Sequence, residues 1–171
     1  MEDTVENRLQ ALEDREKIKE LCATYCFLVD DGRFDELADR HFTEDASCDF
    51  RAVDANATSV LSRGREEIRS FFKSVVAVLL RNMCHTVHNH RISIAGDHAS
   101  GDCYFEMTAT DATSGDAVVG AGRYVDRYRR VDGEWLFAER RAEIWYITPL
   151  SEGWARQRFI ESWRPLVPQG D

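Results

Sequence analysis

The spacing of apolar residues changes from a helical to a strand period near the middle of the chain. Before about residue 80, apolar side chains recur at three- and four-residue steps, as in amphipathic helices. Beyond Arg81 four segments are typical of strands: 85–94, 99–110, 117–131 and 135–148. Gly96-Asp97 and Asp132-Gly133 between them favour tight antiparallel turns. Helices followed by a four-strand meander predict an α+β domain with its helices on one face of an antiparallel sheet.

The first half of the chain is predicted to form three helices and one strand. The first helix extends from Glu6 to about Asp31 and stops at Gly32. The others are expected at 34–42, ending near residues 43–45, and from residue 64 to about 79, with a loose strand at 46–53 and an irregular segment at 54–63. A curved sheet closed by such helices is a cone with an internal cavity, so we expect the N-terminal helices on its concave face.

The chain of 171 residues is expected to form a single domain, because no break in composition divides it. Residues 1–8 are expected to fray, and 152–164 have the spacing of a C-terminal helix that ends before Pro165. No apolar run approaches the roughly 18 residues of a membrane span, and the acidic start lacks the core of a signal peptide. We therefore expect a cytoplasmic protein with no membrane partner.

The net charge restricts the classes of partner, and the cysteines indicate the redox compartment. The net charge of -9 works against nucleic acid, which requires a basic surface, and a neutral or amphipathic small molecule fits better. The five cysteines are odd in number and contain no Cys-x-x-Cys pair, which predicts free thiols in a reducing compartment. Cys22 and Cys26 lie on an apolar helix face, where they are expected to act as small hydrophobic residues.

Two fragments carry the polar groups of a small acid/base pocket. Tyr25, Asp30 and Asp31 end the first predicted helix, and His85 begins the first strand of the meander. A carboxylate at a helix C-terminus is unfavourable by roughly 0.3 to 1 kcal/mol, so helix stability does not explain the acids. Two plainer interpretations remain: the acids are turn residues neutralised by Arg33, and the tyrosine is part of the core.

Several motifs resemble the SnoaL-like branch of the nuclear transport factor 2-like superfamily, and most closely its scytalone dehydratase and bile-acid dehydratase type. They are Ile18-Lys-Glu-Leu-Cys-Ala-Thr-Tyr25, Asp30-Asp-Gly-Arg-Phe-Asp-Glu-Leu37, His85-x-x-x-Asn89 and Tyr124-Val-Asp-Arg-Tyr-Arg-Arg-Val-Asp-Gly-Glu-Trp135. The resemblance covers roughly residues 5 to 150. It implies a base dyad of Asp30 and His85 with Tyr25 beside it. The bile-acid enzymes have further Asp and Arg residues on their strands. The corresponding positions here are near Met107 and Ile144, so these residues have no match.

The chemistry that these residues predict is proton transfer. Imidazole titrates near neutral pH, so His85 is the expected general base, and Asp30 would fix its tautomer. Tyr25 would bind a substrate carbonyl or protonate a leaving hydroxyl. The predicted function is a cofactor-free lyase of the dehydratase type, or an isomerase, acting on a small hydrophobic or polycyclic hydroxy or keto compound. The alternative is a non-catalytic module of the same fold that binds a ligand or assembles a complex.

Further residues are expected to line the pocket. Asn89 shares a strand face with His85 if no bulge intervenes, which makes it a possible hydrogen-bonding residue for the substrate. Aromatic candidates for the lining, which would suit the core equally well, are Phe50, Phe72, Phe105, Trp145 and Tyr146. The chain is expected to be a homo-oligomer, a trimer or dimer, associating through its sheet.

Two other patterns are assigned no role in catalysis. His88 and His90 share one predicted strand face, as two zinc ligands would, but no spacing identifies a third ligand such as Glu106 or His98. No metal and no organic cofactor are therefore expected. Near the end of the last strand, Arg140, Arg141 and Glu143 either reach the pocket or form ion pairs on an exposed sheet face, and the ion pairs are the favoured interpretation.

Overall fold

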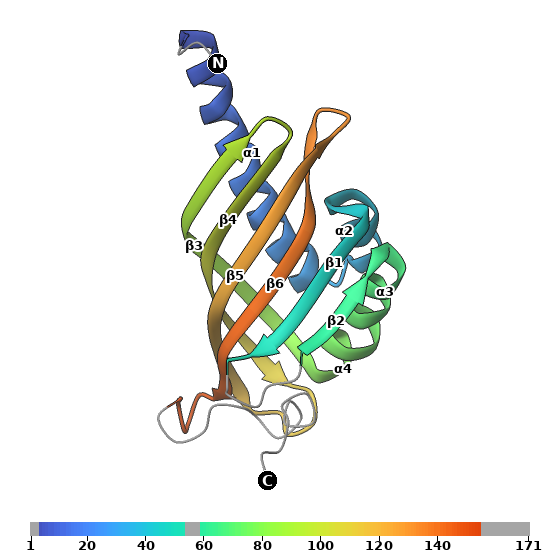
Figure 1. Cartoon of the computed structure of the whole chain (residues 1–171). Helices are drawn as coiled ribbons and strands as arrows, with labels where there is room; N and C mark the ends of the chain where they lie inside the picture. Colours follow the sequence, from blue (N-terminus) through green and yellow to red (C-terminus); the bar gives the residue numbers. More distant parts are fainter. Residues whose placement is uncertain (1–3, 54–58, 155–171) are drawn as a thin grey trace.

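A six-stranded curved sheet forms one layer of the protein and the helices form the other (Figure 1). The computed structural model describes residues 4–53 and 59–154. The helical segments are α1 (Val5–Asp30), α2 (Phe34–His41), α3 (Gly64–Phe71), the π-helix η1 (Phe72–Val76) and α4 (Ala77–Leu79). The strands are β1 (Phe42–Ala52), β2 (Ser59–Arg63), β3 (Leu80–Ala95), β4 (His98–Asp111), β5 (Ala117–Val131) and β6 (Glu134–Pro149).

The predicted meander is confirmed. Strands β3 to β6 pair consecutively and antiparallel, and the sheet order is β2-β1-β6-β5-β4-β3. Gly96 and Gly133 have φ of 62° and 84°, which is the left-handed geometry that tight turns require and glycine adopts readily. The edge strands β2 and β3 do not meet, so the sheet remains open, and α1 lies across it as Figure 1 shows.

Four local expectations are corrected. Strand β1 pairs parallel to β6, so the sheet is mixed; the two strands are far apart in sequence and no hairpin dictates their direction. Residues 59–63 form β2, antiparallel to β1, although five residues carry too little pattern to predict a strand. The third helix is interrupted by the π-helix at Phe72–Val76. The second helix ends at His41, because β1 already begins at Phe42.

Helix α1 begins at Val5, where the Thr4 side chain accepts a hydrogen bond from the backbone N–H of Asn7 at 3.2 Å. Residues 5–8 are therefore helical, and residues 1–3 lie outside the described part. No described helix combines the length and the apolar character that a membrane span requires. Of the predicted C-terminal helix, residues 155–164 lie outside the described residues, and the described 152–154 are not helical.

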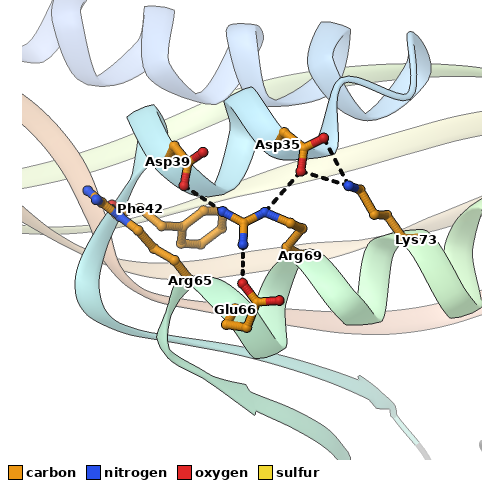
Figure 2. A network of polar contacts seen from close by, with 7 residues as sticks. All are labelled: Asp35, Asp39, Phe42, Arg65, Glu66, Arg69 and Lys73. Atoms are coloured by element: carbon orange, nitrogen blue, oxygen red, sulfur yellow. Dashed lines mark hydrogen bonds and ion pairs between the residues drawn. The ribbon is translucent and has the colours of Figure 1, made fainter.

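Charged side chains connect α2 to α3 (Figure 2). The guanidinium of Arg69 on α3 contacts Asp35 at 3.0 Å, Asp39 at 2.5 Å and Glu66, and Lys73 binds Asp35 at 2.7 Å. The carboxylates are more than half exposed, so water screens each pair and its contribution to stability is small. The network therefore aligns the two helices more than it stabilises the fold.

Gly122 on β5 is expected to tolerate no side chain. A Cβ atom there would lie 2.3 Å from the carbonyl oxygen of Glu143 and 2.6 Å from the ring of Phe105. Overpacking of this kind costs about 1–3 kcal/mol, so Gly122→Ala should lower the free energy of unfolding in urea by that amount. Gly120→Ala is the control, because its Cβ meets the flexible side chain of Met107 at 3.0 Å. Equal losses in the two variants would contradict the prediction.

Candidate active site

Asp30 and His85 meet where the end of α1 lies against the first part of β3. The backbone N–H of His85 donates to Asp30 Oδ2 at 2.8 Å, and the ring nitrogen Nδ1 contacts Oδ1. The two side chains are 8% and 15% exposed for His85 and Asp30, respectively. The two residues that the sequence paired, 55 positions apart, therefore form a two-point contact in a largely buried setting.

This contact favours one tautomer of the neutral imidazole ring. An ionised carboxylate only accepts hydrogen bonds, so Nδ1 of His85 carries the proton that it donates to Asp30. The other ring nitrogen, Nε2, is then an acceptor and the basic atom of the pair. The two N–H donors of His85 also compensate the carboxylate for its unfavourable place at the helix C-terminus.

The neighbouring acid faces elsewhere. Asp31 is the C-cap of α1 and is exposed, and its backbone N–H bonds to the carbonyl of Phe27 at 2.9 Å. Gly32 follows with φ of 70° and ends the helix as predicted. Adjacent residues on a helix point about 100° apart, so only one of the two acids can reach His85.

Tyr25 lies deep in the core. Its ring packs edge-on against Phe42, Phe72, Tyr124 and Phe137, with centroids 5.7–6.5 Å apart, and it is 1% exposed. Burial raises the pKa of its phenol well above the usual value, so the hydroxyl stays protonated. Among the described residues its contacts run to these rings and to Arg140 rather than to the Asp30–His85 pair.

A β-bulge changes the faces of β3. His88 pairs with Tyr104 and Arg91 with Asp102, so Asn89 and His90 together stand opposite the single residue Cys103. Asn89 has φ of 56° and is exposed, which separates it from the face of His85. The expectation that Asn89 shares this face depended on an unbroken strand and is wrong. The bulge instead turns His90 toward Cys103 and away from the face of His88.

The predicted aromatic lining divides between the interior and the periphery. Phe72 and Phe105 are buried, and Phe105 stacks on Tyr124 at 4.5 Å. Phe50 is half-buried against Phe71. The other two lie elsewhere: Trp145 is 38% exposed beside the equally exposed Tyr104, and Tyr146 stacks on Trp154.

Trp145 and Tyr146 border a shallow hollow instead of the interior. Together with Val53 and Trp154 they line a pocket of about 300 Å³. A larger groove of about 760 Å³ lies mostly over the outer side of the sheet and is lined by charged residues, including Asp49, Arg91 and Arg127. Asp30 and His85 line neither of these two pockets.

A buried ion pair is the main feature that the sequence did not predict. Arg140 donates to Asp126 through Nε at 3.1 Å and through Nη2 at 2.9 Å, and both side chains are fully buried. The guanidinium lies 3.9–4.1 Å from the ring centroids of Tyr25, Tyr124 and Phe137. The expectation of an exposed Arg140 is therefore wrong, whereas Arg141 does pair with Glu143 at 3.1 Å on the outer side.

Opposing effects act on the pKa of Asp126. Burial raises the pKa of Asp126 to about 6, while the charge of Arg140 and its hydrogen bonds act in the opposite direction. Tyr128 also donates to Asp126 at 2.9 Å. One sequence signal was available: Asp126 stands between Tyr124 and Tyr128 at the two-residue period of one strand face.

Comparisons with known proteins agree with this architecture. The model of the SnoaL-like domain family matches residues 10–141. A hexachlorocyclohexane dehydrochlorinase from Novosphingobium barchaimii has a similar structure, with a TM-score of 0.71 and 22% identity over 90% of this chain and 98% of the other.

Two further similar structures come from Novosphingobium aromaticivorans. A scytalone dehydratase-like protein has a TM-score of 0.70 and 20% identity over 81% of this chain and 89% of its own. The β subunit of a protein assigned as an aromatic-ring-hydroxylating dioxygenase has a TM-score of 0.68 and 19% identity over 81% and 93%. At these identities the solved structures establish a shared fold.

Proposed function

The chain belongs to the SnoaL-like domain family, with the nuclear transport factor 2-like fold, and from this premise we propose that it is a proton-transfer enzyme. It would act as a lyase of the dehydratase type, or as an isomerase, on a small hydrophobic or polycyclic hydroxy or keto compound. The observation that carries the proposal is the two-point contact of Asp30 with His85. This chemistry requires no cofactor, because imidazole itself supplies the base.

In the proposed reaction Nε2 of His85 removes a proton from the carbon beside a substrate carbonyl. The electron pair of the broken C–H bond forms a C=C bond, and the hydroxyl on the next carbon leaves with its bonding pair. The imidazolium returns the proton to that hydroxyl, so the products are an unsaturated ketone and water. Asp30 stabilises the imidazolium and holds the ring, as the acid does in other carboxylate–histidine pairs.

Tyr25 keeps its predicted role with one restriction. A phenol that burial holds in its protonated form is a hydrogen-bond donor and a poor base. Its proposed part is therefore to donate a hydrogen bond to a substrate carbonyl oxygen that reaches into the interior, and not to protonate a leaving hydroxyl, because the raised pKa makes the phenol a weak acid. The proposal depends on Asp30 and His85 and would survive without Tyr25.

The similar structures support both this proposal and its rival. Two of them carry names of elimination or dehydration enzymes, which favours the lyase, and the third is a subunit of a larger assembly. The rival, a non-catalytic binding or assembly module, has no need of a buried acid on the ring nitrogen of a histidine. Self-association through the sheet stays a prediction, which sedimentation analysis would report as the mass of a dimer or trimer.

The deciding experiment incubates the protein with a panel of cyclic β-hydroxy ketones. Formation of the unsaturated ketone is followed by ultraviolet absorbance, and exchange of the α-proton in D₂O by NMR. We expect at least one compound to react, and His85→Ala to lower its rate by about 10²- to 10⁴-fold. His88→Ala is the matched control, because this ring packs against Tyr104 on the other strand face. Binding of panel members without exchange or elimination would favour the rival.

A further inference from the structure

Three potential metal ligands converge from three elements inside the protein. Cys22 comes from α1, His90 from β3 and Cys103 from β4, and their ligand atoms all lie within 4.8 Å of one another. The two cysteines are buried and the histidine is half-buried. We propose that these three side chains bind a Zn²⁺ ion, at a site separate from the Asp30–His85 pair.

The backbone is built to bring His90 to this place. Without the bulge His90 would stay on the face of His88; with it, the ring reaches the two thiols. The bulge requires Asn89 to adopt φ of 56°, which is uncommon outside glycine. Bulges often reorient a side chain beside a functional site. A backbone conformation that is uncommon and delivers an imidazole to two buried thiols supports a ligand role.

The donor set suits zinc. Thiolate sulfur and imidazole nitrogen are its usual protein ligands, at about 2.3 Å and 2.0–2.1 Å, which places ligand atoms about 3.5–3.8 Å apart in a tetrahedron. The spacing of at most 4.8 Å is slightly wider, and small side-chain rotations would close it. Three protein ligands leave the fourth position to a water molecule or another small ligand.

A positively charged group lies beside one of the two thiols. Arg140 Nη2 lies 3.8 Å from Cys22 Sγ and can donate to the sulfur. Two thiolates neutralise a divalent ion, and Arg140 neutralises Asp126, so the occupied site adds no net charge to the core.

The position of the site indicates a structural role. Cys22 lies eight residues before Asp30 on α1, a separation of about 12 Å along the helix axis, so the ion would not touch groups at the dyad. It would attach α1 to the β3–β4 hairpin, the same elements that hold Asp30 and His85 together. This inference does not depend on the proposed reaction.

The test uses the full chain, reduced and freed of metal. Zn²⁺ is titrated against a chromophoric chelator, and Co²⁺ is added separately to record thiolate-to-cobalt charge-transfer absorption. We expect one equivalent of either ion and charge-transfer bands in the Co²⁺ form. His90→Ala should weaken Zn²⁺ binding by at least about 100-fold, because loss of an outer-shell partner alone costs 10- to 100-fold.

Matched variants separate the site from other metal-binding groups. His88→Ala and Cys26→Ser should bind as the parent does, whereas Cys22→Ser and Cys103→Ser should lose the charge-transfer bands. If the buried cysteine variants fail to fold by circular dichroism, the half-buried His90 still decides the question. Absence of stoichiometric binding, or equal affinity of His90→Ala and His88→Ala, would overturn the proposal.

Discussion

Asp30→Asn is expected to lower kcat/KM for the proposed elimination by about 10²- to 10⁴-fold, mostly through kcat. The carboxylate accepts from both the backbone N–H and the ring Nδ1–H of His85. An amide offers one acceptor oxygen and an NH₂ group that only donates, so it satisfies one of these donors and opposes the other. The imidazole of His85 would then favour the tautomer that carries its proton on Nε2. A protonated Nε2 cannot act as the base.

The measurement is steady-state kinetics on a compound that the panel identifies. Asp31→Asn is the control: the substitution is the same, one residue further along, and this side chain is exposed. It should change kcat/KM by less than about twofold, since surface substitutions are usually close to neutral. A fully active Asp30→Asn would remove Asp30 from the mechanism as a positioning residue. NMR detection of the proton on Nε2 in that variant would confirm the tautomer argument directly.

Asp126→Ala is expected to lower the free energy of unfolding by about 3–5 kcal/mol, because it leaves the buried guanidinium of Arg140 without its counter-charge. Replacing both partners, as in Asp126→Leu with Arg140→Met, should recover most of this loss. Breaking a buried pair strands a charge, whereas removing both charges also removes the cost of burying them.

Urea unfolding of the single and double variants measures this difference. The comparison pair is Arg91 with Asp102, which joins β3 to β4 at 2.6 Å with the arginine 76% exposed. Asp102→Ala should cost less than about 1 kcal/mol, because water screens this pair. The buried-charge argument fails if Asp126→Ala costs no more than Asp102→Ala, or if the double variant is less stable than both single variants.

The elements of the fold followed from local signals. Period and turn residues placed all four meander strands within a few residues of their positions, because a glycine at each tight turn fixes where one strand ends and the next begins. The Asp30–His85 pair was also found, because the resemblance to the SnoaL-like branch implies this dyad and helix stability does not explain an acid at a helix C-terminus. The short β2 and the π-helix were missed because neither has a distinct residue period.

Two of the β-bulges that orient interior side chains were decided by tertiary structure. On β6, Phe137 pairs with Tyr128 but Glu139 with Arg127, so one extra residue lies between them and turns Arg140 inward and Arg141 outward. On β3 the bulge at Asn89 does the same for His90. A single inserted residue reverses every later side chain of a strand, and its place depends on pairing with a neighbouring strand that local sequence does not encode.

The sequence by itself therefore determined the order of elements and the turns, which rest on residues that act locally, and its resemblance to a known family indicated the acid–histidine pair. Only the tertiary structure decided what fills the interior between α1 and the sheet. There, strand register brings Arg140 to Asp126, and the bulge on β3 brings His90 to Cys22 and Cys103. These contacts join elements remote in the chain, so their positions follow from packing.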